Sequence, residues 1–545
     1  MKNPSAQRRR DFFLCCGNST LLVEMTEKTW NFFKKSIFFF RFLWYDDKQD
    51  FYGTGTFCRR GGDAMKKHWK AVLLWAVLLL GTLSGCFFRS PEDLYQSPEP
   101  PADYQNLTQK IRDVKNGLAQ EYGVAEVDDI SVIAGDNTAL IQLQDMDGDG
   151  QRETAVTFFR VPGAEKPLKI YFFTKTQEDV YNVSAMLEGD GSGIYQIDYV
   201  DLNGEGYKEV VVSWQMSTGA YLLGVYSLEE PMSRNCRQAE LSNSAQNTIG
   251  LPDRQDLRGE EWMTTAYGDY VLTDLDQNNE SELCVVRIDP KGANSAVEVY
   301  TWQNGTFGEK DSAPLSVGIR SMSASGVKQD YLAGEVLGRA LYVSTELNDE
   351  RHAVDVVAYQ NGKLVNLSLD PTTHVSVETL SQYVDLEPTD VNGDGVLELP
   401  EPVSLPQSED TTASDFWLID WWQYQTNGKR TKACTTYHNV ADGWYLLVPD
   451  DWKDQITLSR YDAVSGQRAV IFSHLKGDGT SEPFLVIYKF TSQTNRANTS
   501  NRFVLREEKD AVYAAAFYNS EWDCGMNETE LRAAFRLIQN GWSDG

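Results

Sequence analysis

Histidine, cysteine and basic residues are scarce in this chain of 545 residues. It has five His and eight Cys, and its 50 Lys and Arg are outnumbered by 79 Asp and Glu, which gives a net charge of −29. No HExxH motif, GxSxG elbow or P-loop occurs. The usual motifs of metalloproteases, α/β-hydrolases and P-loop nucleotide-binding proteins are therefore missing. Nucleic acid is excluded as a partner because it requires basic patches.

Cysteine pairs with the spacing of a metal or redox site are also missing. Beyond Cys86, four Cys are far apart in the sequence, and none belongs to a CxxC pair: Cys236, Cys284, Cys434 and Cys524. This spacing does not support a zinc ribbon or a thioredoxin-like site. Export would permit disulfides, and four Cys leave three connectivities open.

The long hydrophobic run that bears on targeting begins after Met65. Lys66, Lys67 and Lys70 precede ten uninterrupted apolar residues at 71–80, too few for a comfortable bilayer span but typical of a signal peptide. The run ends at Leu-Ser-Gly-Cys86, which resembles the lipobox of bacterial lipoproteins. The resemblance implies that 65–85 is a signal peptide and that Cys86 carries a lipid anchor on the extracytoplasmic face of a bacterial membrane. A membrane helix that contains a Cys by chance is the alternative.

The remaining regions are assigned by composition. Residues 1–64 show no clear period, and codons for Arg60 to Asp63 can spell a ribosome-binding sequence before Met65, so we expect 1–64 to be a mis-assigned upstream leader. A cytoplasmic extension is the alternative. Residues 86–104 are expected to hold the anchor and a Pro-, Ser- and Glu-rich tether. From Cys86 onward 36 basic residues accompany 72 acidic ones, and we expect residues 105–545 to form the folded domain.

One acidic loop of nine residues recurs four times in that domain. Carboxylate or amide side chains stand at positions 1, 3, 5 and 9, in acidic loops 1 to 4 at residues 145–153, 201–209, 274–282 and 390–398. The predicted metal ligands are Asp145, Asp147, Asp149 and Glu153; Asp201, Asn203, Glu205 and Glu209; Asp274, Asp276, Asn278 and Glu282; and Asp390, Asn392, Asp394 and Glu398.

Calcium accounts for this spacing because a hard cation takes six to eight oxygen ligands. Position 6 must turn sharply with positive φ, which suits Gly150, Gly206 and Gly395, and which Asn279 tolerates. Position 2 is apolar in every copy, so we expect it to point into the domain. An EF-hand is disfavoured because position 12 lacks a carboxylate in three copies and the flanks, such as 210–212, are typical of strands.

The loops and their β-rich flanks resemble FG-GAP and VCBS-type repeats, the calcium loops of β-propellers such as the integrin α-subunit head. The resemblance implies an all-β, β-propeller-like repeat domain with Ca²⁺ as cofactor. The last loop interval is twice 58 residues, so a degenerate unit near 330–334 is expected to fill it. A decayed copy at 474–482 has His474 and Lys476 at positions 1 and 3, and we expect Lys476 to replace the ion there. These units predict six or seven blades.

Two helices and one aromatic segment complete the expectations. Helices are predicted at 107–122 and at 528–539, the second capped by Asn527 with Glu530 at its third position. The segment 416–424 alternates like a strand buried on both faces. Its alternative is an exposed platform on which Trp421 or Trp422 stacks against sugars.

The function expected from these features is that of a lipid-anchored extracellular calcium-binding protein. It would be a non-enzymatic binding or adhesion module for a protein or a glycan. An extracellular polysaccharide hydrolase or lyase on the same scaffold is the alternative and would require a pair of Asp or Glu in a cleft. A sensor or assembly subunit of an envelope complex is a third possibility. The sequence identifies neither the ligand nor its distance from the calcium loops.

Overall fold

The computed structural model describes residues 13–16, 19–22, 102–176, 180–243, 252–381, 386–406, 416–491 and 501–538. The chain divides into two units, 1–99 and 100–545. In the first unit, β1 (Phe13–Cys16) pairs antiparallel with β2 (Ser19–Leu22). The signal peptide at 65–85 and the anchor at Cys86 lie outside the described residues, so both stay predictions. No described helix is long and apolar enough to span a membrane.

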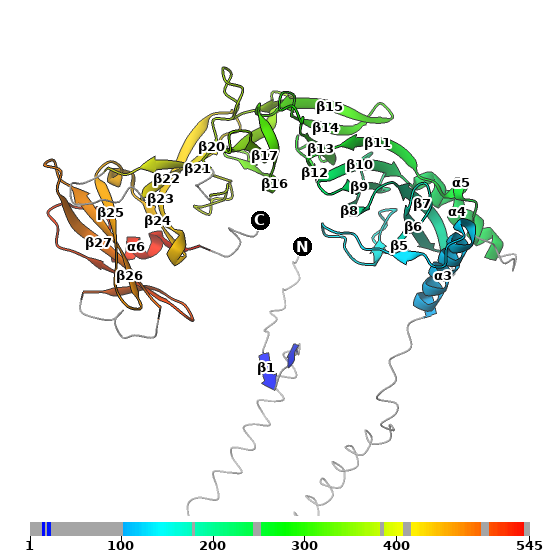
Figure 1. Cartoon of the computed structure of the whole chain (residues 1–545), viewed down its shortest axis with the longest axis horizontal. Coiled ribbons are helices and arrows are strands. Elements are labelled where there is room, and N and C mark those ends of the chain that lie inside the picture. Colours follow the sequence, from blue (N-terminus) through cyan, green and yellow to red (C-terminus); the bar gives the residue numbers. More distant parts are fainter. Residues whose placement is uncertain are drawn as a thin grey trace, which may run out of the picture. The chain divides into compact units, whose positions relative to one another are not determined.

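The second unit is all-β, with six antiparallel sheets that follow one another along the chain (Figure 1). The first sheet has the order β3-β5-β6-β7, with β4 also paired to β5: β3 (Asp128–Asp129), β4 (Ile141–Gln144), β5 (Thr154–Arg160), β6 (Leu168–Lys175) and β7 (Tyr181–Gly189). The second has the order β11-β10-β9-β8: β8 (Gly193–Val200), β9 (Glu209–Ser217), β10 (Ala220–Ser227) and β11 (Glu260–Ala266).

The third and fourth sheets are also meanders. The third has the order β12-β13-β14-β15: β12 (Asp269–Thr273), β13 (Glu282–Arg287), β14 (Ala296–Gln303) and β15 (Thr306–Pro314). The fourth has the order β16-β17-β18-β19, with β20 also paired to β18: β16 (Ile319–Leu332), β17 (Gly338–Leu347), β18 (His352–Gln360), β19 (Lys363–Asn366) and β20 (Thr379–Leu380). The degenerate unit expected at 330–334 covers the end of β16 and the start of the turn to β17.

The last two sheets each depart from a simple meander at one edge. The fifth has the order β21-β22-β23-β24-β30: β21 (Leu399–Ser404), β22 (Trp417–Tyr424), β23 (Arg430–Asn439), β24 (Trp444–Val448) and β30 (Phe535–Leu537). The sixth has the order β25-β26-β27-β29-β28: β25 (Ile456–Val464), β26 (Gln467–Leu475), β27 (Ser481–Phe490), β28 (Phe503–Glu507) and β29 (Val512–Phe517).

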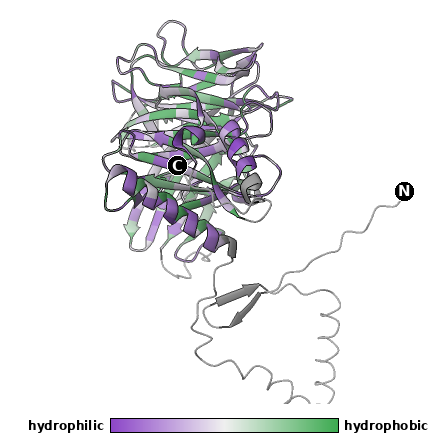
Figure 2. Ribbon diagram, turned by 90° about the vertical axis from the view of Figure 1, so that its right-hand side faces the viewer, coloured by the Kyte–Doolittle hydropathy of each residue, from purple (hydrophilic) through white to green (hydrophobic). Residues whose placement is uncertain are grey.

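Consecutive sheets pack face to face, which explains why their inner strands are apolar on both faces. Residues of neighbouring sheets share one hydrophobic cluster at each junction, as in the pairs Val156 and Val212, Val211 and Leu283, Val299 and Leu341, Tyr342 and Leu399, and Leu446 and Phe472. Hydrophobic residues are concentrated on these strands (Figure 2). No cluster of the described residues joins the first sheet to the sixth. The six sheets are consistent with an all-β repeat domain, and the propeller stays a prediction.

Helices cover parts of the sheets. α3 (Ala102–Tyr122) includes the helix predicted at 107–122, and it buries Leu107, Val114 and Leu118 in one cluster with Phe159 of the first sheet. α4 (Glu229–Asn243) is also long, with 15 residues. The short helical elements are α5 (Arg254–Leu257) and the 3₁₀ turns η2 (Val440–Asp442) and η3 (Asp450–Trp452).

The C-terminal helix α6 (Glu528–Ala534) begins as predicted but ends early. Asn527 and Glu530 form the expected capping box. The predicted extension to residue 539 is wrong, because Phe535–Leu537 form β30 and pair with β24. Phe535 packs against Trp444 with ring centroids 5.6 Å apart. Burial of this aromatic side chain and strand pairing outweigh the local helix propensity.

Candidate metal sites

Acidic loops 1 to 3 each connect two antiparallel strands. Loop 1 joins β4 to β5, loop 2 joins β8 to β9, and loop 3 joins β12 to β13. Loop 4 is closed by an antiparallel bridge between Thr389 and Glu398, and β21 begins directly after it. The strand–loop–strand arrangement predicted from the flanks is confirmed for loops 1 to 3, and in loop 4 a single bridge stands in place of the first strand.

The aspartate at position 1 organises each loop. Its two carboxylate oxygens accept the backbone N–H groups of positions 4 and 6 in loops 1, 2 and 4, for example those of Gly148 and Gly150 onto Asp145 at 2.9 and 3.0 Å. In loop 3, Asp274 accepts from Asn278 and Asn279 at 2.9 and 3.1 Å. Hydrogen bonds within each loop therefore hold the side chains that could bind a metal ion on one side of the loop.

The expected conformations at positions 2 and 6 are confirmed. Position 6 has positive φ in all four loops, at 90° for Gly150, 88° for Gly206, 69° for Asn279 and 82° for Gly395. Position 2 is buried in all four loops, at Met146, Leu202, Leu275 and Val391. The apolar residue holds each loop against the sheet, and the donors at positions 3 and 5 face outward.

The glutamate at position 9 is completely buried in three of the loops, at Glu209, Glu282 and Glu398. One oxygen of each accepts the position-2 backbone N–H, as Glu209 does from Leu202 at 2.9 Å. Burial, and then repulsion from the loop aspartates, raise the pKa of Glu209 and of Glu398 to about 7. A buried carboxylate beside other carboxylates is costly unless a cation neutralises it.

Three of the loops bring carboxylates together closely enough to hold a metal ion. One oxygen from each member lies within 4.8 Å of the others in three groups: Asp145, Asp147, Asp149 and Glu153; Asp274, Asp276 and Glu282; and Asp390, Asp394 and Glu398. Loop 2 has as many carboxylates at its ligand positions as loops 3 and 4, but Asp201, Glu205 and Glu209 do not form such a group in the described structure; the amide oxygen of Asn203 is a further possible ligand. These all-oxygen donor sets suit a hard cation better than zinc or copper.

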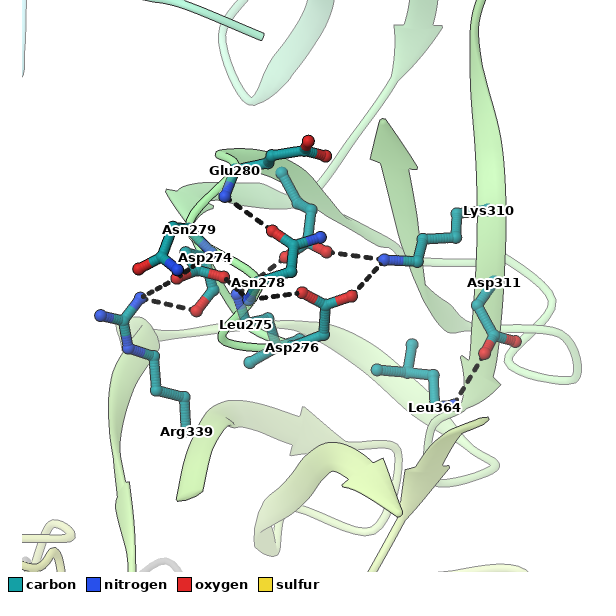
Figure 3. A network of polar contacts seen from close by, with 11 residues as sticks. Asp274, Leu275, Asp276, Asn278, Asn279, Glu280, Lys310, Asp311, Arg339 and Leu364 are labelled. Carbon is teal, nitrogen blue, oxygen red and sulfur yellow. Dashed lines mark hydrogen bonds and ion pairs between the residues drawn. The ribbon is translucent and has the colours of Figure 1, made fainter. Parts of the chain in front are cut away.

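Loop 3 differs from the others because it has basic partners (Figure 3). The Lys310 ammonium on β15 contacts the carboxylates of Asp276 and Glu282, the latter at 2.9 Å. Arg339 on β17 donates to the Asp274 carbonyl at 2.6 Å. In loop 4 the neighbouring group is neutral: the Gln423 amide donates to Asp394 and Glu398 at 2.8 and 2.7 Å. No Lys or Arg within the described ranges forms an ion pair with the donors of loops 1, 2 and 4.

The decayed copy at 474–482 joins β26 to β27. Lys476 forms an ion pair with Glu482 at 3.0 Å, which agrees with the expected replacement of an ion by an internal lysine. Position 1 is His474, whose ring stacks on Trp522 with centroids 4.7 Å apart and so contributes to packing.

The aromatic segment 416–424 is a buried strand, as expected. Within β22, Trp421 is fully buried and its indole N–H donates to Thr436 at 2.7 Å. Trp422 is covered by the Arg430 guanidinium, 3.9 Å from its ring centroid. The alternative reading of this segment as an open sugar platform is therefore wrong.

Two features near the loops could not be found from local sequence. Lys310 and Gln423 approach loops 3 and 4 from strands 28 and 25 residues after the position-9 glutamates. A cavity of about 470 Å³ adjoins loop 2 and is lined by Asn203, Glu205 and Trp262, among others. No sequence motif marks either feature, because each depends on how the strands pair in the folded chain.

Comparisons with known proteins assign no family. No family model matches the sequence, and no curated protein matches it. Among solved structures, an exotype rhamnogalacturonan lyase is similar with a TM-score of 0.23 and 11% identity, over 65% of this chain and 75% of that chain. A likeness this distant assigns neither a family nor an activity.

Proposed function

We propose that this protein is a lipid-anchored, calcium-binding module on the outer face of a bacterial membrane, which binds a glycan or a protein. The observation that carries the calcium part is the buried position-9 glutamate of loops 2 and 4, which lies beside loop aspartates and has no basic partner in the described part of the chain. Calcium ions would neutralise these groups. The sheets, stacked in sequence order, are consistent with a β-propeller-like domain of six blades.

The calcium ions have a structural role in this proposal. All four loops bury their position-2 residue, so an ion bound there would hold the loop against its sheet. Because calcium binds the native loops and not the unfolded chain, it would stabilise the fold by about 2.7 kcal/mol per site at 100 times the dissociation constant. A chelator would remove this contribution without unfolding the hydrophobic junctions.

The cavity beside loop 2 is our candidate for the ligand site. It is lined by the indoles of Trp262 and Trp302, whose ring centroids are 4.6 Å apart, and by the charged groups of Glu205 and Arg234. An apolar surface next to carboxylate and guanidinium groups suits a sugar, which has an apolar face and hydroxyl edges. This favours a glycan over a protein ligand.

Two measurements test the proposal. Equilibrium dialysis at pH 8 should show calcium bound to the protein, and substituting Asp147→Ala should reduce the number of bound ions. For the ligand, a glycan-binding screen of the protein should detect a ligand that is lost in Trp302→Ala but kept in Trp417→Ala, which alters an exposed indole far from loop 2 in sequence. A protein that binds no calcium would refute the metal part, and equal glycan binding by both variants would refute the ligand site.

The anchor is tested separately. Expressed in a bacterium, the chain should fractionate with membranes and incorporate labelled fatty acid, whereas Cys86→Ser should do neither. Labelling that persists in Cys86→Ser would show that the lipid is attached at another residue and that the sequence ending at Cys86 is not used as a lipobox.

A further inference from the structure

A positively charged side chain of the protein itself, that of Lys310, lies against the carboxylates of loop 3. The Lys310 ammonium reaches Asp276 at position 3 and Glu282 at position 9, two of the groups that a bound metal ion would bridge (Figure 3). Both ends of this contact are sheltered, since the Lys310 side chain is 22% exposed and that of Glu282 is 0% exposed. The ammonium also lies 5.3 Å from the ring centroid of Tyr359, which covers it from the fourth sheet.

The charges of loop 3 are nearly balanced without a metal. The three carboxylates that cluster in loop 3 face Lys310 and Arg339, and the Arg339 guanidinium lies 3.7 Å from the Asp274 carboxylate. The fourth carboxylate of the loop, Glu280, is exposed and outside the cluster. Loop 1 has four carboxylates, and no ion pair in the described part of the chain balances them. A divalent cation added to loop 3 would meet two positive charges, and a protonated amine has no lone pair with which to bind it.

Loop 4 provides the matched comparison. The Gln423 amide approaches Asp394 and Glu398 much as Lys310 approaches its two carboxylates. An amide is neutral, and by rotation it can present its oxygen to a cation instead of its NH₂ group. The group opposite loop 4 is therefore compatible with a metal ion, whereas the group opposite loop 3 competes with one.

We propose that Lys310 takes the place of calcium in loop 3, so that this loop folds without a metal while loops 1, 2 and 4 bind calcium. The inference rests on the proposed function for the other three loops. Arg339 and Tyr359 belong to the fourth sheet, whereas loop 3 and Lys310 belong to the third. The internal cation thus ties two neighbouring sheets together independently of the calcium concentration.

Reciprocal substitutions test the proposal by counting bound calcium. The wild type should bind three ions in equilibrium dialysis at pH 8. Lys310→Gln, which gives loop 3 the group found opposite loop 4, should bind four. Gln423→Lys, which gives loop 4 the group found opposite loop 3, should bind two. The control is Lys115→Gln, which removes the ion pair between helix α3 and Asp129, involves no residue of the four acidic loops and should leave the count at three.

Terbium luminescence locates the added ion. Tyr359 should sensitise Tb³⁺ bound in loop 3 of Lys310→Gln, and the extra signal should disappear in Lys310→Gln combined with Tyr359→Leu. If Lys310→Gln unfolds in chelator, recovery of its near-UV circular dichroism on adding calcium supports the proposal. Failure to recover in excess calcium overturns it.

The outcomes separate this proposal from the proposed function. Three ions in both the wild type and Lys310→Gln would overturn the role of Lys310 and leave the calcium function standing. No ion in the wild type but one in Lys310→Gln would refute the calcium function and support the role of Lys310. No ion in either protein would refute both, and four ions in the wild type would show that calcium displaces Lys310.

Discussion

Substituting Glu209→Gln should have opposite effects on stability with and without calcium. Glu209 is fully buried, and its pKa is raised from 4.5 to about 7, first by burial and then by Asp201. At pH 8 the folded protein must ionise this buried group, which at 1.36 kcal/mol per pKa unit costs roughly 3 kcal/mol. Glutamine is neutral and can still accept the Leu202 N–H. In chelator, Glu209→Gln should therefore be more stable than the wild type by up to about 3 kcal/mol.

In saturating calcium the order should reverse. The carboxylate is then a charged ligand, and its replacement by an amide weakens calcium binding in loop 2, so the variant gains less from the ion. Urea unfolding at pH 8 in EGTA and in calcium measures both states. Glu280→Gln is the control, because this exposed side chain at position 7 of loop 3 is expected to be free of the metal and should change neither curve. Equal destabilisation of Glu209→Gln in both conditions would refute the reasoning.

The same groups predict a pH dependence. In chelator, the folded-state pKa values of Glu209 and Glu398, about 7, lie above their ordinary value of 4.5. Their contribution to stability is therefore fully present below pH 4.5 and is lost as the pH rises through 7. Calcium should remove this loss, because it compensates the ionised carboxylates. A free energy of unfolding that rises from pH 5 to pH 8 in chelator would contradict the assignment.

Three further predictions concern other parts of the structure. Gly148→Ala places a Cβ 2.5 Å from the Gly206 carbonyl oxygen at φ +74°, whereas Gly150→Ala at φ +90° meets no atom within 4 Å. Backbone strain should lower the free energy of unfolding of both variants by roughly 1–2 kcal/mol. Gly148→Ala should be destabilised further and should bind calcium more weakly in loops 1 and 2. Denaturation measures the first effect, and dialysis measures the second. Trp421→Ala should cost about 3–5 kcal/mol, against little for Trp417→Ala at a 39% exposed site, and equal melting temperatures would contradict the buried strand. Burial lowers the pKa of His438 from 6.5 to about 3, so stability should fall as the pH drops below 6.5, and His438→Phe should flatten that acid limb.

Local patterns predicted the parts of this structure that local contacts determine. The acidic loops could be recognised in the sequence because each is held together by hydrogen bonds within nine residues. One example is the Gly150 N–H, which donates to the Asp145 carboxylate. The strands beside them followed from runs of β-branched residues such as 210–212, and the Asn527 cap followed from a motif of four residues. The second unit has six sheets, and their identity as the predicted six or seven blades of a propeller stays a prediction.

Features that depend on distant residues were not predictable. Phe535–Leu537 became a strand because β24 offers a free edge there, which the helical pattern of 528–539 does not reveal. Lys310 reaches loop 3 only because β15 lies two strands away from β13 in the third sheet. The signal peptide and Cys86 lie outside the described residues, so their assignment still depends on the sequence pattern.

Thermal unfolding at defined calcium concentrations tests the central claim, that the acidic loops bind calcium, most directly. At pH 8 the melting temperature of the wild type should rise steadily with the logarithm of free calcium above the dissociation constant, because each native site adds RT ln(1 + [Ca²⁺]/Kd) of stability. Magnesium at equal concentration should raise it less, because Mg²⁺ demands near-ideal octahedral geometry and gives up its water ligands reluctantly. A melting curve that is the same in excess EGTA and in millimolar calcium would contradict the claim.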